Sequence, residues 1–469
     1  MNFILKGHDN KYIVETTIQI FYPNQSHTPI DNLLDNQTIL LSELTNNIAY
    51  AKLYTNKILI SQKAQKLSNA TQNSIIRELK YTIYTLLQDF TGLYSPWGML
   101  TGIRPIKKIR EAIEIDKISN PRKMLQDIYL MSEDKAKLLY EIYINQKPIL
   151  NDKYLSDNRH ANLYIGIPFC PSRCLYCSFT SNKIEEKKSN LYLDAIISEL
   201  SQKKDQINNR IIKSIYIGGG TPTSLSAKQL IKLMDSIFEN IDTSQILELT
   251  VEAGRPDTIT KEKLQILKNY NTTRISINPQ TMNNSTLAKI GRDHTAKEFV
   301  AAFNLARSMG FDNINVDLIL GLMDETIQDV ESTITQIANL NPSSITVHTL
   351  AIKRASKLKD DLTNITIKLD DIKSIDTSHN LINSYVKSLG MKPYYLYKQK
   401  NTIGNSHNIG YAKDDYVSLY NIHIMEDTQD IIALGAGAIS KFINFDTNKI
   451  TRIANPKDVD EYIRRQNNV

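Results

Sequence analysis

The sequence predicts an α/β protein built on six parallel strands, with an α+β region before them and an α/β segment after them. From Asn162 onward, strand-like apolar runs alternate with helical patterns, as in successive βα units. Clusters of Cys, Gly and polar residues directly follow several of these runs, and the residues before Asn162 follow a different rhythm. Six βα units fit a partial barrel or an open sheet. Either arrangement places the chemistry at the carboxyl ends of the strands.

The composition is that of a globular chain of two or three domains. Its 469 residues include 56 Lys and Arg against 50 Asp and Glu, a net charge of +6, and 41% are hydrophobic. The charge is spread out without a long basic tract, so we expect no nucleic-acid partner, although the balance would suit an anionic small substrate. No apolar run approaches the roughly 18 residues of a spanning helix, so we expect no membrane span and a cytoplasmic location.

Residues 1–155 are predicted to form an N-terminal α+β domain. The run Tyr12–Tyr22 is rich in β-branched residues, which predicts an extended segment, and Ile48–Ser61 alternates apolar and polar residues as a strand does. From Asn69 the period becomes that of a helix with one apolar face. Its apolar positions are Ile75, Ile76, Leu79, Ile83, Leu86, Leu87 and Phe90. Pro and Gly in Ser95–Pro105 end this pattern, and further helices are expected to about Gln146.

Residues 156–390 are predicted to form the central sheet with its helices, after a polar linker at Asn151–Asn162. The predicted strands are Leu163–Pro168, Ser214–Gly218, Leu247–Ala253, Arg274–Gln280, Asn313–Gly321 and Ser344–Ala351. Residues 391–469 are predicted to add a C-terminal α/β extension. It contains Pro393–Gln399 and, after a Gly-rich turn, Leu434–Ser440.

Three cysteines follow the first predicted strand of the sheet. Cys170, Cys174 and Cys177 are the only cysteines of the chain and lie within eight residues, in a C-x-x-x-C-x-x-C pattern. Thiolates are preferred ligands of iron–sulfur clusters, and three of them would leave one iron of a four-iron cluster open to a substrate or cofactor. A zinc site would need a fourth Cys or a His, and the nearest are His160 and His294. The remaining alternative is three buried thiols without a metal.

A run of glycines and several polar residues follow the later strands. Gly218-Gly-Gly-Thr-Pro222 can bring its backbone close to a ligand, although such a run is often only a turn. The polar residues at strand ends are Glu252, Ser276, Asn278, Gln280 and Asp317. Because these ends meet at one edge of a parallel sheet, we expect a shared polar pocket there. Arg292 either pairs with a carboxylate in this pocket or forms a surface ion pair.

The histidines and aromatic residues of the later segments leave alternatives open. His348 lies within the sixth predicted strand, while His407 and Asn408 lie in a Gly-rich loop; each histidine is either a hydrogen-bonded structural residue or a ligand or acid/base. Trp97 and the tyrosines of Pro393–Tyr397 either pack in the core or line an aromatic wall.

Several motifs, in order, resemble a known family. Ile167-Pro-Phe-Cys-Pro-Ser-Arg-Cys-Leu-Tyr-Cys-Ser-Phe179 and Gly218-Gly-Gly-Thr-Pro-Thr223 resemble the radical S-adenosylmethionine (SAM) enzymes. Arg274-Ile-Ser-Ile-Asn-Pro-Gln280, Ile290-Gly-Arg-Asp293, Asn315-Val-Asp-Leu-Ile-Leu-Gly-Leu322 and Leu434-Gly-Ala-Gly-Ala-Ile-Ser440 resemble the oxygen-independent coproporphyrinogen III oxidase family. This match covers roughly residues 160–445. Leu100–Pro105 and Tyr394–Lys400 are similar to its HemZ-type branch, the coproporphyrinogen dehydrogenases.

The resemblance implies a fold, two kinds of cofactor and a reaction. The fold would be a partial (β/α)6 TIM-like radical SAM barrel, and the cofactors would be a 4Fe-4S cluster and one or two molecules of SAM. The protein would be an oxidoreductase of haem biosynthesis that converts two propionates of coproporphyrinogen III to vinyl groups, giving protoporphyrinogen IX. A 5′-deoxyadenosyl radical derived from SAM would start each round. The partners would be the tetrapyrrole and an electron-donor protein such as a flavodoxin or ferredoxin.

The resemblance also assigns site residues by motif. Cys170, Cys174 and Cys177 would hold the cluster. The residues that would contact the cluster-bound SAM are Tyr164, Gly219 and Glu252, with Tyr176 against its adenine. Those that match the set for a second SAM are Gly220, Thr221, Gln280, Arg292, Asp317, Ala351 and Ile439. From charge and position, Arg255 and Arg292 are candidate partners for the propionates.

Three positions depart from the family pattern. Phe179 stands where the characterised oxidases carry a fourth Cys, Gly166 replaces a His, and Met323 replaces a Pro. Phe179 matches the related haem chaperones, which share the fold and bind haem, and His407-Asn-Ile-Gly-Tyr-Ala412 keeps all but the Trp of their His-Asn-x-x-Tyr-Trp pattern. The resemblance therefore leaves three hypotheses: a porphyrinogen decarboxylase, a haem-binding chaperone, and a radical SAM enzyme with another substrate.

Overall fold

The computed structural model of the chain describes residues 1–23, 25–177, 181–351, 369–399, 402, 405–447 and 449–467. It divides into two compact units. Unit 1 comprises residues 1–141, 360–376 and 398–407, and unit 2 comprises residues 142–359, 377–397 and 408–469. In the described part of the chain, no helix is both long and apolar enough to cross a membrane. The predicted domain boundaries after residues 155 and 390 stay predictions.

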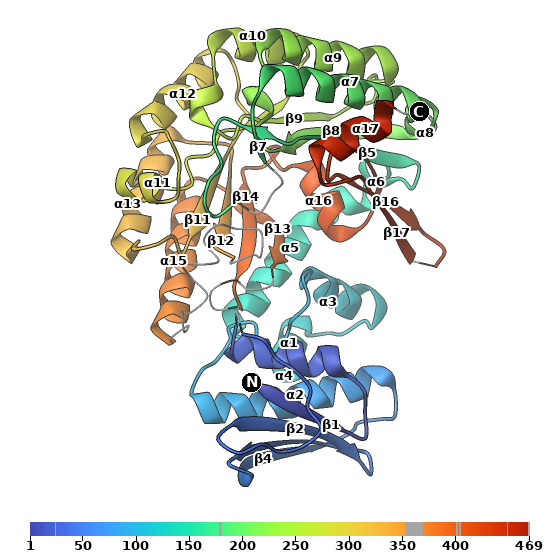
Figure 1. Ribbon diagram of the computed structural model, residues 1–469, viewed down its shortest axis with the longest axis vertical. Coiled ribbons are helices and arrows are strands. Elements are labelled where there is room, and N and C mark those ends of the chain that lie inside the picture. Colours follow the sequence, from blue (N-terminus) through green and yellow to red (C-terminus); the bar gives the residue numbers. More distant parts are fainter. Residues whose placement is uncertain are drawn as a thin grey trace. The chain divides into compact units, whose positions relative to one another are not determined.

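Unit 1 contains a four-stranded sheet with two helices packed against it. The strands, in sheet order, are β1 (Asn2–Lys6), β2 (Thr38–Thr45), β3 (Ile48–Thr55) and β4 (Ile58–Lys66). β1 and β2 are parallel, and the other two pairs are antiparallel. Helices α1 (Lys11–Phe21) and α2 (Gln72–Thr91) pack on each other and on this sheet (Figure 1). The fully buried side chains of their shared core include Phe3, Leu40, Leu53, Ile83 and Leu87.

The extended segment predicted for Tyr12–Tyr22 is wrong, because this segment is helix α1. Val14, Ile18 and Phe21 recur at helical spacing and are buried in the core of unit 1. The hydroxyls of Thr16 and Thr17 donate back along the helix to main-chain carbonyls, at 2.8 and 2.7 Å. The strand preference of β-branched residues is therefore outweighed by the burial of one apolar helix face.

The helix predicted from Asn69 is confirmed as α2. Its N-cap, Thr71, accepts a hydrogen bond from the Ser74 amide at 3.3 Å, and the helix ends at Gly92, whose φ of 68° is left-handed. Leu79, Ile83, Leu86 and Leu87 of the predicted stripe are buried. The helices that follow are α3 (Ile106–Arg110), which continues into a π-helical turn (Glu111–Ile115), α4 (Pro121–Tyr129), and α5 (Glu133–Asn151), which runs on into unit 2.

Unit 2 is built on a mixed sheet whose central strands are parallel. In spatial order the strands are β13 (Lys392–Lys398), β14 (His407–Ala412), β12 (Ser344–Thr349), β11 (Ile314–Leu320), β10 (Arg274–Ser276), β9 (Glu248–Glu252), β8 (Ile211–Gly219), β5 (His160–Ile167), β15 (Asp430–Leu434), β16 (Ile439–Asn444) and β17 (Lys449–Ala454). All neighbours from β15 to β12 are parallel. The α/β class and the six predicted parallel strands, β5 and β8 to β12, are confirmed.

Helices follow the parallel strands around the outside of the sheet in Figure 1. They are α7 (Glu186–Gln202), α8 (Lys204–Asn208), α9 (Ala227–Asn240), α10 (Lys261–Asn269), α11 (Asn284–Lys289), α12 (Ala296–Ser308) and α13 (Ile327–Leu340). The remaining elements are α6 (Lys153–Ser156), the small pair β6 (Phe169–Cys170) and β7 (Asn182–Lys183), 3-10 turns at Pro222–Ser224 and Pro256–Thr258, α15 (Leu369–Ser388), α16 (Leu419–Glu426) and α17 (Val459–Asn467).

The two faces of the parallel sheet differ in chemistry. One face is apolar and buried; its residues include Ile217, Val251, Ile275, Val316 and Val347. Because side chains alternate along a strand, the register aligns a second set on the opposite face. That set is polar and aromatic, and it includes Tyr164, Tyr216, Glu252, Ser276, Asn278, Asn315, Asp317, Thr346 and His348. The sheet thus buries its apolar face against helices and keeps its polar face for a site.

Candidate functional site

The cysteine loop begins at the carboxyl end of β5. Cys170 is the last residue of β6, which pairs with β7, and Cys174 and Cys177 follow in a loop. The Leu175 amide donates to the Ile290 carbonyl at 3.0 Å, and the Cys177 amide donates to the Cys174 carbonyl at 3.2 Å. None of the three cysteines forms a disulfide. The loop is thereby held by its backbone while all three sulfurs keep their thiol chemistry.

Two arginines surround the cysteine loop with positive charge. Arg255 donates Nε and Nη2 to the two carboxylate oxygens of Asp257, each at 2.9 Å. Its Nη1 donates to Ser172 Oγ at 3.0 Å and lies 3.9 Å from Cys174 Sγ. Arg292, which is 6% exposed, also interacts electrostatically with Cys174. Burial raises the pKa of the Cys170 thiol to about 11, partly offset by Thr221, whose Oγ1 lies 3.4 Å away.

These features fit a cluster site. A bound iron replaces the thiol proton, and neighbouring guanidinium groups stabilise the thiolate that remains. Among the described residues, no three His, Cys, Asp or Glu side chains converge as ligands of one metal ion. In a four-iron cluster each cysteine binds a different iron, so its sulfurs stand apart. Of the histidines considered for zinc, His160 accepts from the Asp157 amide at 3.3 Å, and His294 is buried at 3% exposure beside the charges of Arg255 and Arg292.

The glycine turn after β8 packs tightly under the cysteine loop. Gly219 has a left-handed φ of 106°, which glycine adopts without strain. The Gly220 amide donates to the Ile167 carbonyl at 2.8 Å, and a Cβ at this position would lie 2.6 Å from the Phe169 carbonyl oxygen. The Thr221 amide donates to the same Phe169 carbonyl at 2.7 Å. The turn and the loop are therefore one hydrogen-bonded unit that accepts no side chain between them.

Glu252 lies at the end of β9 and faces this turn. Its Oε2 accepts from the Gly219 amide at 3.1 Å, and its Oε1 accepts from the Tyr216 hydroxyl at 2.5 Å. Desolvation raises the pKa of Glu252 to about 7, because it exceeds the opposing effect of the bond from Tyr216, and the charge of Asp317 acts in the same direction. A carboxyl group that titrates near neutral pH at a strand end is typical of a binding site.

Three tyrosine rings stack beside Glu252. Tyr164 of β5 lies with its ring centroid 6.2 Å from that of Tyr216 and 6.2 Å from that of Tyr420 of α16, and the last two centroids are 4.6 Å apart. Desolvation raises the pKa of all three phenols, so they are neutral at physiological pH. The stack forms a rigid aromatic floor on the polar face of the sheet.

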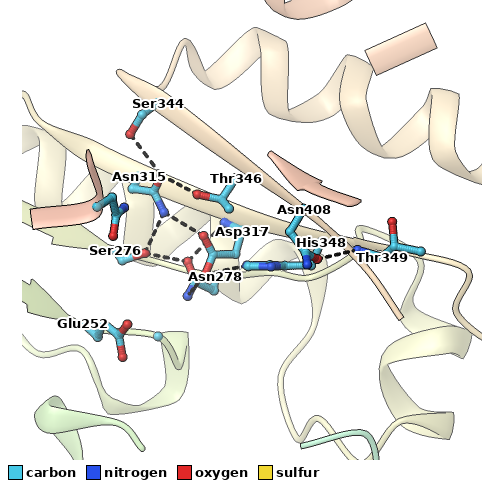
Figure 2. Close-up of polar contacts among 12 residues, drawn as sticks. Glu252, Ser276, Asn278, Asn315, Asp317, Ser344, Thr346, His348, Thr349 and Asn408 are labelled. Atoms are coloured by element: carbon cyan, nitrogen blue, oxygen red, sulfur yellow. Dashed lines mark hydrogen bonds and ion pairs between the residues drawn. The ribbon is translucent and has the colours of Figure 1, made fainter. Parts of the chain in front are cut away.

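A hydrogen-bonded network around Asp317 occupies the strands beyond Glu252 (Figure 2). Asp317 accepts from Asn278 Nδ2 at 2.9 Å and from Asn315 Nδ2 at 2.7 Å, and its Oδ2 lies 3.7 Å from His348 Nε2. Burial alone would raise the pKa of Asp317, but the hydrogen bonds from His348, Asn315 and Thr346 outweigh it and hold that pKa below its usual range. The site thus holds one carboxylate that stays charged and another, Glu252, that titrates.

The structure brings together some of the predicted site residues and leaves others apart. Gln280 adopts a left-handed φ of 70°, and its main-chain N–H donates to the main-chain carbonyl of Asp317 at 3.1 Å. Its side-chain oxygen is buried and has no hydrogen-bond partner among the described residues. Tyr176 packs on an apolar cluster and interacts with Arg292. Ala351 follows β12, and Ile439 begins β16 and is 49% exposed.

The two candidate propionate partners are both held inside the protein. Arg255 is 2% exposed and paired with Asp257, so the prediction that it faces the tetrapyrrole is not supported by its position. Arg292 donates Nη1 to the Gly254 carbonyl at 3.0 Å, and its Nε is buried without a partner among the described residues. Of these two arginines, Arg292 is therefore the one with an N–H group, at Nε, that has no hydrogen-bond partner among the described residues.

The motif shared with haem chaperones is buried where the structure describes it. His407 packs edge-on against Trp97, with ring centroids 5.1 Å apart, and Asn408 Oδ1 accepts from the Thr349 amide at 2.9 Å. His348 lies 3.4 Å from the hydroxyl of Tyr397, and Tyr394 and Tyr395 are buried. His407, Trp97 and these tyrosines are therefore packing residues. Phe179 lies outside the described residues.

Sequence reasoning missed two of the three rings of the aromatic floor and part of the Asp317 network. Tyr216 and Tyr420 belong to the floor, and Tyr420 comes from a distant helix. Asn315 and Thr346 belong to the network. The signal was present in the alternation Ser344-Ile-Thr-Val-His348, which places polar residues on one face of an otherwise apolar strand.

Comparison with known proteins identifies the family to which this chain belongs. A family model described as the Radical SAM superfamily matches residues 164–337. An oxygen-independent coproporphyrinogen-III oxidase-like protein of Bacillus subtilis, HemZ, is 39% identical over 406 residues, which cover 84% of this chain and 80% of that protein. The chain belongs to the HemZ family of radical SAM proteins. It therefore uses a 4Fe-4S cluster and SAM, as predicted from the cysteine and glycine motifs.

Two further comparisons place the chain among the relatives of HemZ. Heme chaperone HemW of Bacillus subtilis is 33% identical over 254 residues, covering 54% of this chain and 67% of that protein. The solved structure of coproporphyrinogen III oxidase (HemN) from Escherichia coli has a TM-score of 0.52 and 23% identity, covering 66% of this chain and 70% of that chain. The second likeness confirms the fold. The relatives thus include proteins named as oxidases or oxidase-like and a protein named as a haem chaperone.

Proposed function

We propose that the protein oxidatively decarboxylates propionate side chains of coproporphyrinogen III to vinyl groups in haem biosynthesis. Each round would remove one hydrogen atom from the propionate β-carbon, release CO2, and pass one electron to an acceptor. The relative that is 39% identical is named an oxygen-independent coproporphyrinogen-III oxidase-like protein, and the match extends over both units of this chain. The haem chaperones match a smaller part of the chain.

The observation that carries the proposal is the continuous contact path from the cysteine loop to Glu252. Cys170 lies against Thr221, the glycine turn is bonded to the loop backbone, and Gly219 donates to Glu252. When bound, the cluster and SAM would supply one electron and the 5′-deoxyadenosyl radical that abstracts the hydrogen atom. The chain would hold, orient and shield that chemistry.

Each predicted residue has a place in this proposal. Cys170, Cys174 and Cys177 would hold the cluster, and Tyr164, Tyr176, Gly219 and Glu252 would contact the SAM bound to it. Gly220, Thr221, Gln280, Arg292, Asp317, Ala351 and Ile439 would contact a second SAM. The buried, unpartnered oxygen of Gln280 and the spare Nε of Arg292 support a polar ligand at this position.

The aromatic floor and the Asp317 network would do two different jobs. The stacked rings of Tyr164, Tyr216 and Tyr420 exclude water from one side of the site, which protects a reactive intermediate from side reactions. The network fixes the polar side with bonds that are complete before a ligand arrives. A cytoplasmic location and a flavodoxin or ferredoxin donor belong to the same proposal.

An anaerobic turnover assay tests this function. The reconstituted holoprotein is incubated with SAM, a reductant and coproporphyrinogen III, and CO2, 5′-deoxyadenosine and protoporphyrinogen are measured. We expect all three products from the wild type and none from Cys174→Ala. Deoxyadenosine without CO2 would indicate another substrate and contradict the proposal.

A haem carrier is the second candidate, favoured by the chaperone relative and by the sequence His407-Asn408. The burial of His407 against Trp97 argues against this histidine as a haem ligand. Stable stoichiometric haem binding, without CO2 or deoxyadenosine in the same assay, would establish the carrier instead.

A further inference from the structure

A pair of lysines in unit 1 has no part in the site described above. Lys398 is 2% exposed, and its Nζ donates to the Leu100 carbonyl at 2.8 Å and lies 5.3 Å from the centre of the Trp97 ring. Lys80, from α2, donates to Thr101 Oγ1 at 2.7 Å. The two ammonium groups therefore bond to adjacent residues, Leu100 and Thr101, which come from a segment that the proposed reaction does not use.

Neither lysine is paired with a carboxylate in the part of the chain that the structure describes. An ammonium group has three N–H donors, and Lys398 directs one to Leu100, so its charge stays uncompensated. Burial lowers the pKa of Lys398 well below its usual value, and the charge of Lys80 lowers it further. Burial also lowers the pKa of Lys80 to about 8, with a smaller contribution from the charge of Lys108. A buried charge is costly unless a partner neutralises it.

Lys398 lines a hollow that suits an anion. The hollow is open to solvent, and its walls include residues of α1 together with Thr101, Ile103, Lys398, Gln399, Thr402 and Asn405. Among the described residues no Asp or Glu lines it. Its other polar walls include Gln19, Thr101, Thr402 and Asn405, which carry amide or hydroxyl groups. Because Thr101 already accepts from Lys80, its own hydroxyl hydrogen is directed to another acceptor.

We propose that this hollow is a binding site for the phosphate or carboxylate group of a small molecule, with Lys398 as its charged ligand and Thr101 as a neutral donor. The oxyanion would neutralise the Lys398 charge and accept from hydroxyl and amide donors, the contacts by which proteins bind such groups. Lys80 adds positive potential at Lys398, whereas the more distant Lys108 pairs with Glu111 at 2.6 Å. The site is independent of the proposed decarboxylation.

The chain carries its own reporter for this site. Trp97 is its only tryptophan, is 1% exposed, and lies against Lys398, and its indole N–H has no partner among the described residues. The holoprotein is titrated anaerobically with sodium phosphate, and separately with sodium acetate, at an ionic strength held constant with KCl. Tryptophan fluorescence and the midpoint of thermal unfolding are recorded.

We expect a saturable fluorescence change and a rise in the unfolding midpoint with at least one of the two anions. The anion that gives it identifies the phosphate or the carboxylate as the group bound. Lys398→Met should raise the dissociation constant at least tenfold, while Lys57→Met, which removes a surface lysine paired with Asp35 in the same unit, should leave it unchanged. Without anion, Lys398→Met should unfold at the same temperature as the wild type or higher.

Three results would overturn the site. They are a wild type that responds to neither anion beyond the KCl control, a Lys398→Met protein that binds as tightly as the wild type, and a Lys398→Met protein that unfolds at a lower temperature than the wild type in the absence of anion. If Lys398→Met fails to fold, the anion titration of the Thr101→Val protein tests the site instead. Loss of its hydroxyl should raise the dissociation constant at least threefold, and an unchanged constant would reject the proposal.

Discussion

The charged groups at the carboxyl ends of the parallel strands, called the mouth below, and those beside the lysine hollow in unit 1 are held in opposite ways. At the mouth, Arg255 is bonded to Asp257, and Asp317 accepts from two asparagines beside His348. In unit 1, Lys398, which lines the hollow, donates to a carbonyl, and Lys80 donates to a hydroxyl; neither is paired with a carboxylate of the described residues. The comparison teaches that a preorganised site balances its own charges, whereas a site completed by its ligand leaves one sign of charge in excess.

Removing a cluster ligand is the largest perturbation of the mouth. Cys174→Ala should abolish iron binding at full stoichiometry, the brown absorbance and all turnover, because the remaining thiols are too few for a stable cluster. Iron analysis and absorption spectroscopy after anaerobic reconstitution check this. Ser172→Ala, in the same loop, should retain its iron. The anion response of Trp97 in unit 1 should persist in both variants, which would separate the two regions; full iron content in Cys174→Ala would contradict the ligand assignment.

Breaking the Arg255 pair tests whether the mouth depends on its internal balance. Arg255→Met leaves Asp257 without its bidentate partner and removes a guanidinium 3.9 Å from Cys174 Sγ. We expect a loss of about 3 kcal/mol, the low end for a broken buried pair because the Asp257 carboxylate is partly solvated. The shift of the unfolding midpoint relative to the wild type measures this loss of stability. The cluster potential, followed by a redox titration, should become more negative because a positive charge is lost.

A surface pair in the same unit provides the matched control for Arg255. Lys289 and Asp324 form an ion pair at 2.7 Å with both side chains exposed to solvent. Lys289→Met should cost less than about 1 kcal/mol, as exposed pairs do. Equal effects of Arg255→Met and Lys289→Met on the unfolding midpoint would show that the mouth does not depend on its internal pairing.

Neutralising Asp317 is a smaller test of the same idea. Asp317→Asn keeps the shape but offers an amide group to two asparagine donors, so at least one buried donor loses its acceptor. We expect a loss of about 1–3 kcal/mol in stability. Asp324→Asn, at an exposed position, is the control and should change the unfolding midpoint little. An unaltered midpoint in Asp317→Asn would mean that the network rearranges freely.

The difference between the two regions also sets how much the sequence can predict. The mouth is built from strand ends that are close in the sheet because the strands are parallel, so Glu252, Asn278 and Asp317 could be grouped from apolar runs alone. The hollow depends on Lys398 meeting Leu100, almost three hundred positions away, and no local pattern encodes that contact. Helix α1 was missed for a related reason, since burial of its apolar face decides its conformation.

The side-chain contacts at the mouth could not be predicted from the sequence either. Arg255 follows β9 and looks from the sequence like a free cation at the mouth, but Asp257, two residues later, captures it. The stack of Tyr164 and Tyr216 with Tyr420 joins two strands to a helix that follows them by some two hundred residues. Such contacts arise from packing, which the sequence pattern does not specify.

The most subtle prediction concerns the one group at the mouth that is not permanently charged. With a pKa of about 7, Glu252 is partly protonated at neutral pH, and protonation removes the negative charge that would attract the amino group of SAM and weakens the carboxyl group as an acceptor. The dissociation constant for SAM should therefore rise as the pH falls below 7, by up to about tenfold per unit, and level off above pH 8. Equilibrium binding to the holoprotein between pH 6 and 8 measures this. Glu252→Gln should bind SAM more weakly and with a flatter pH profile. Because this variant lacks the titrating carboxyl group, the pH dependence that remains in it measures the titration of SAM itself. A wild-type profile that matches the Glu252→Gln profile would show that Glu252 does not touch SAM, and that the mouth, unlike the lysine hollow, keeps no charge in reserve for its ligand.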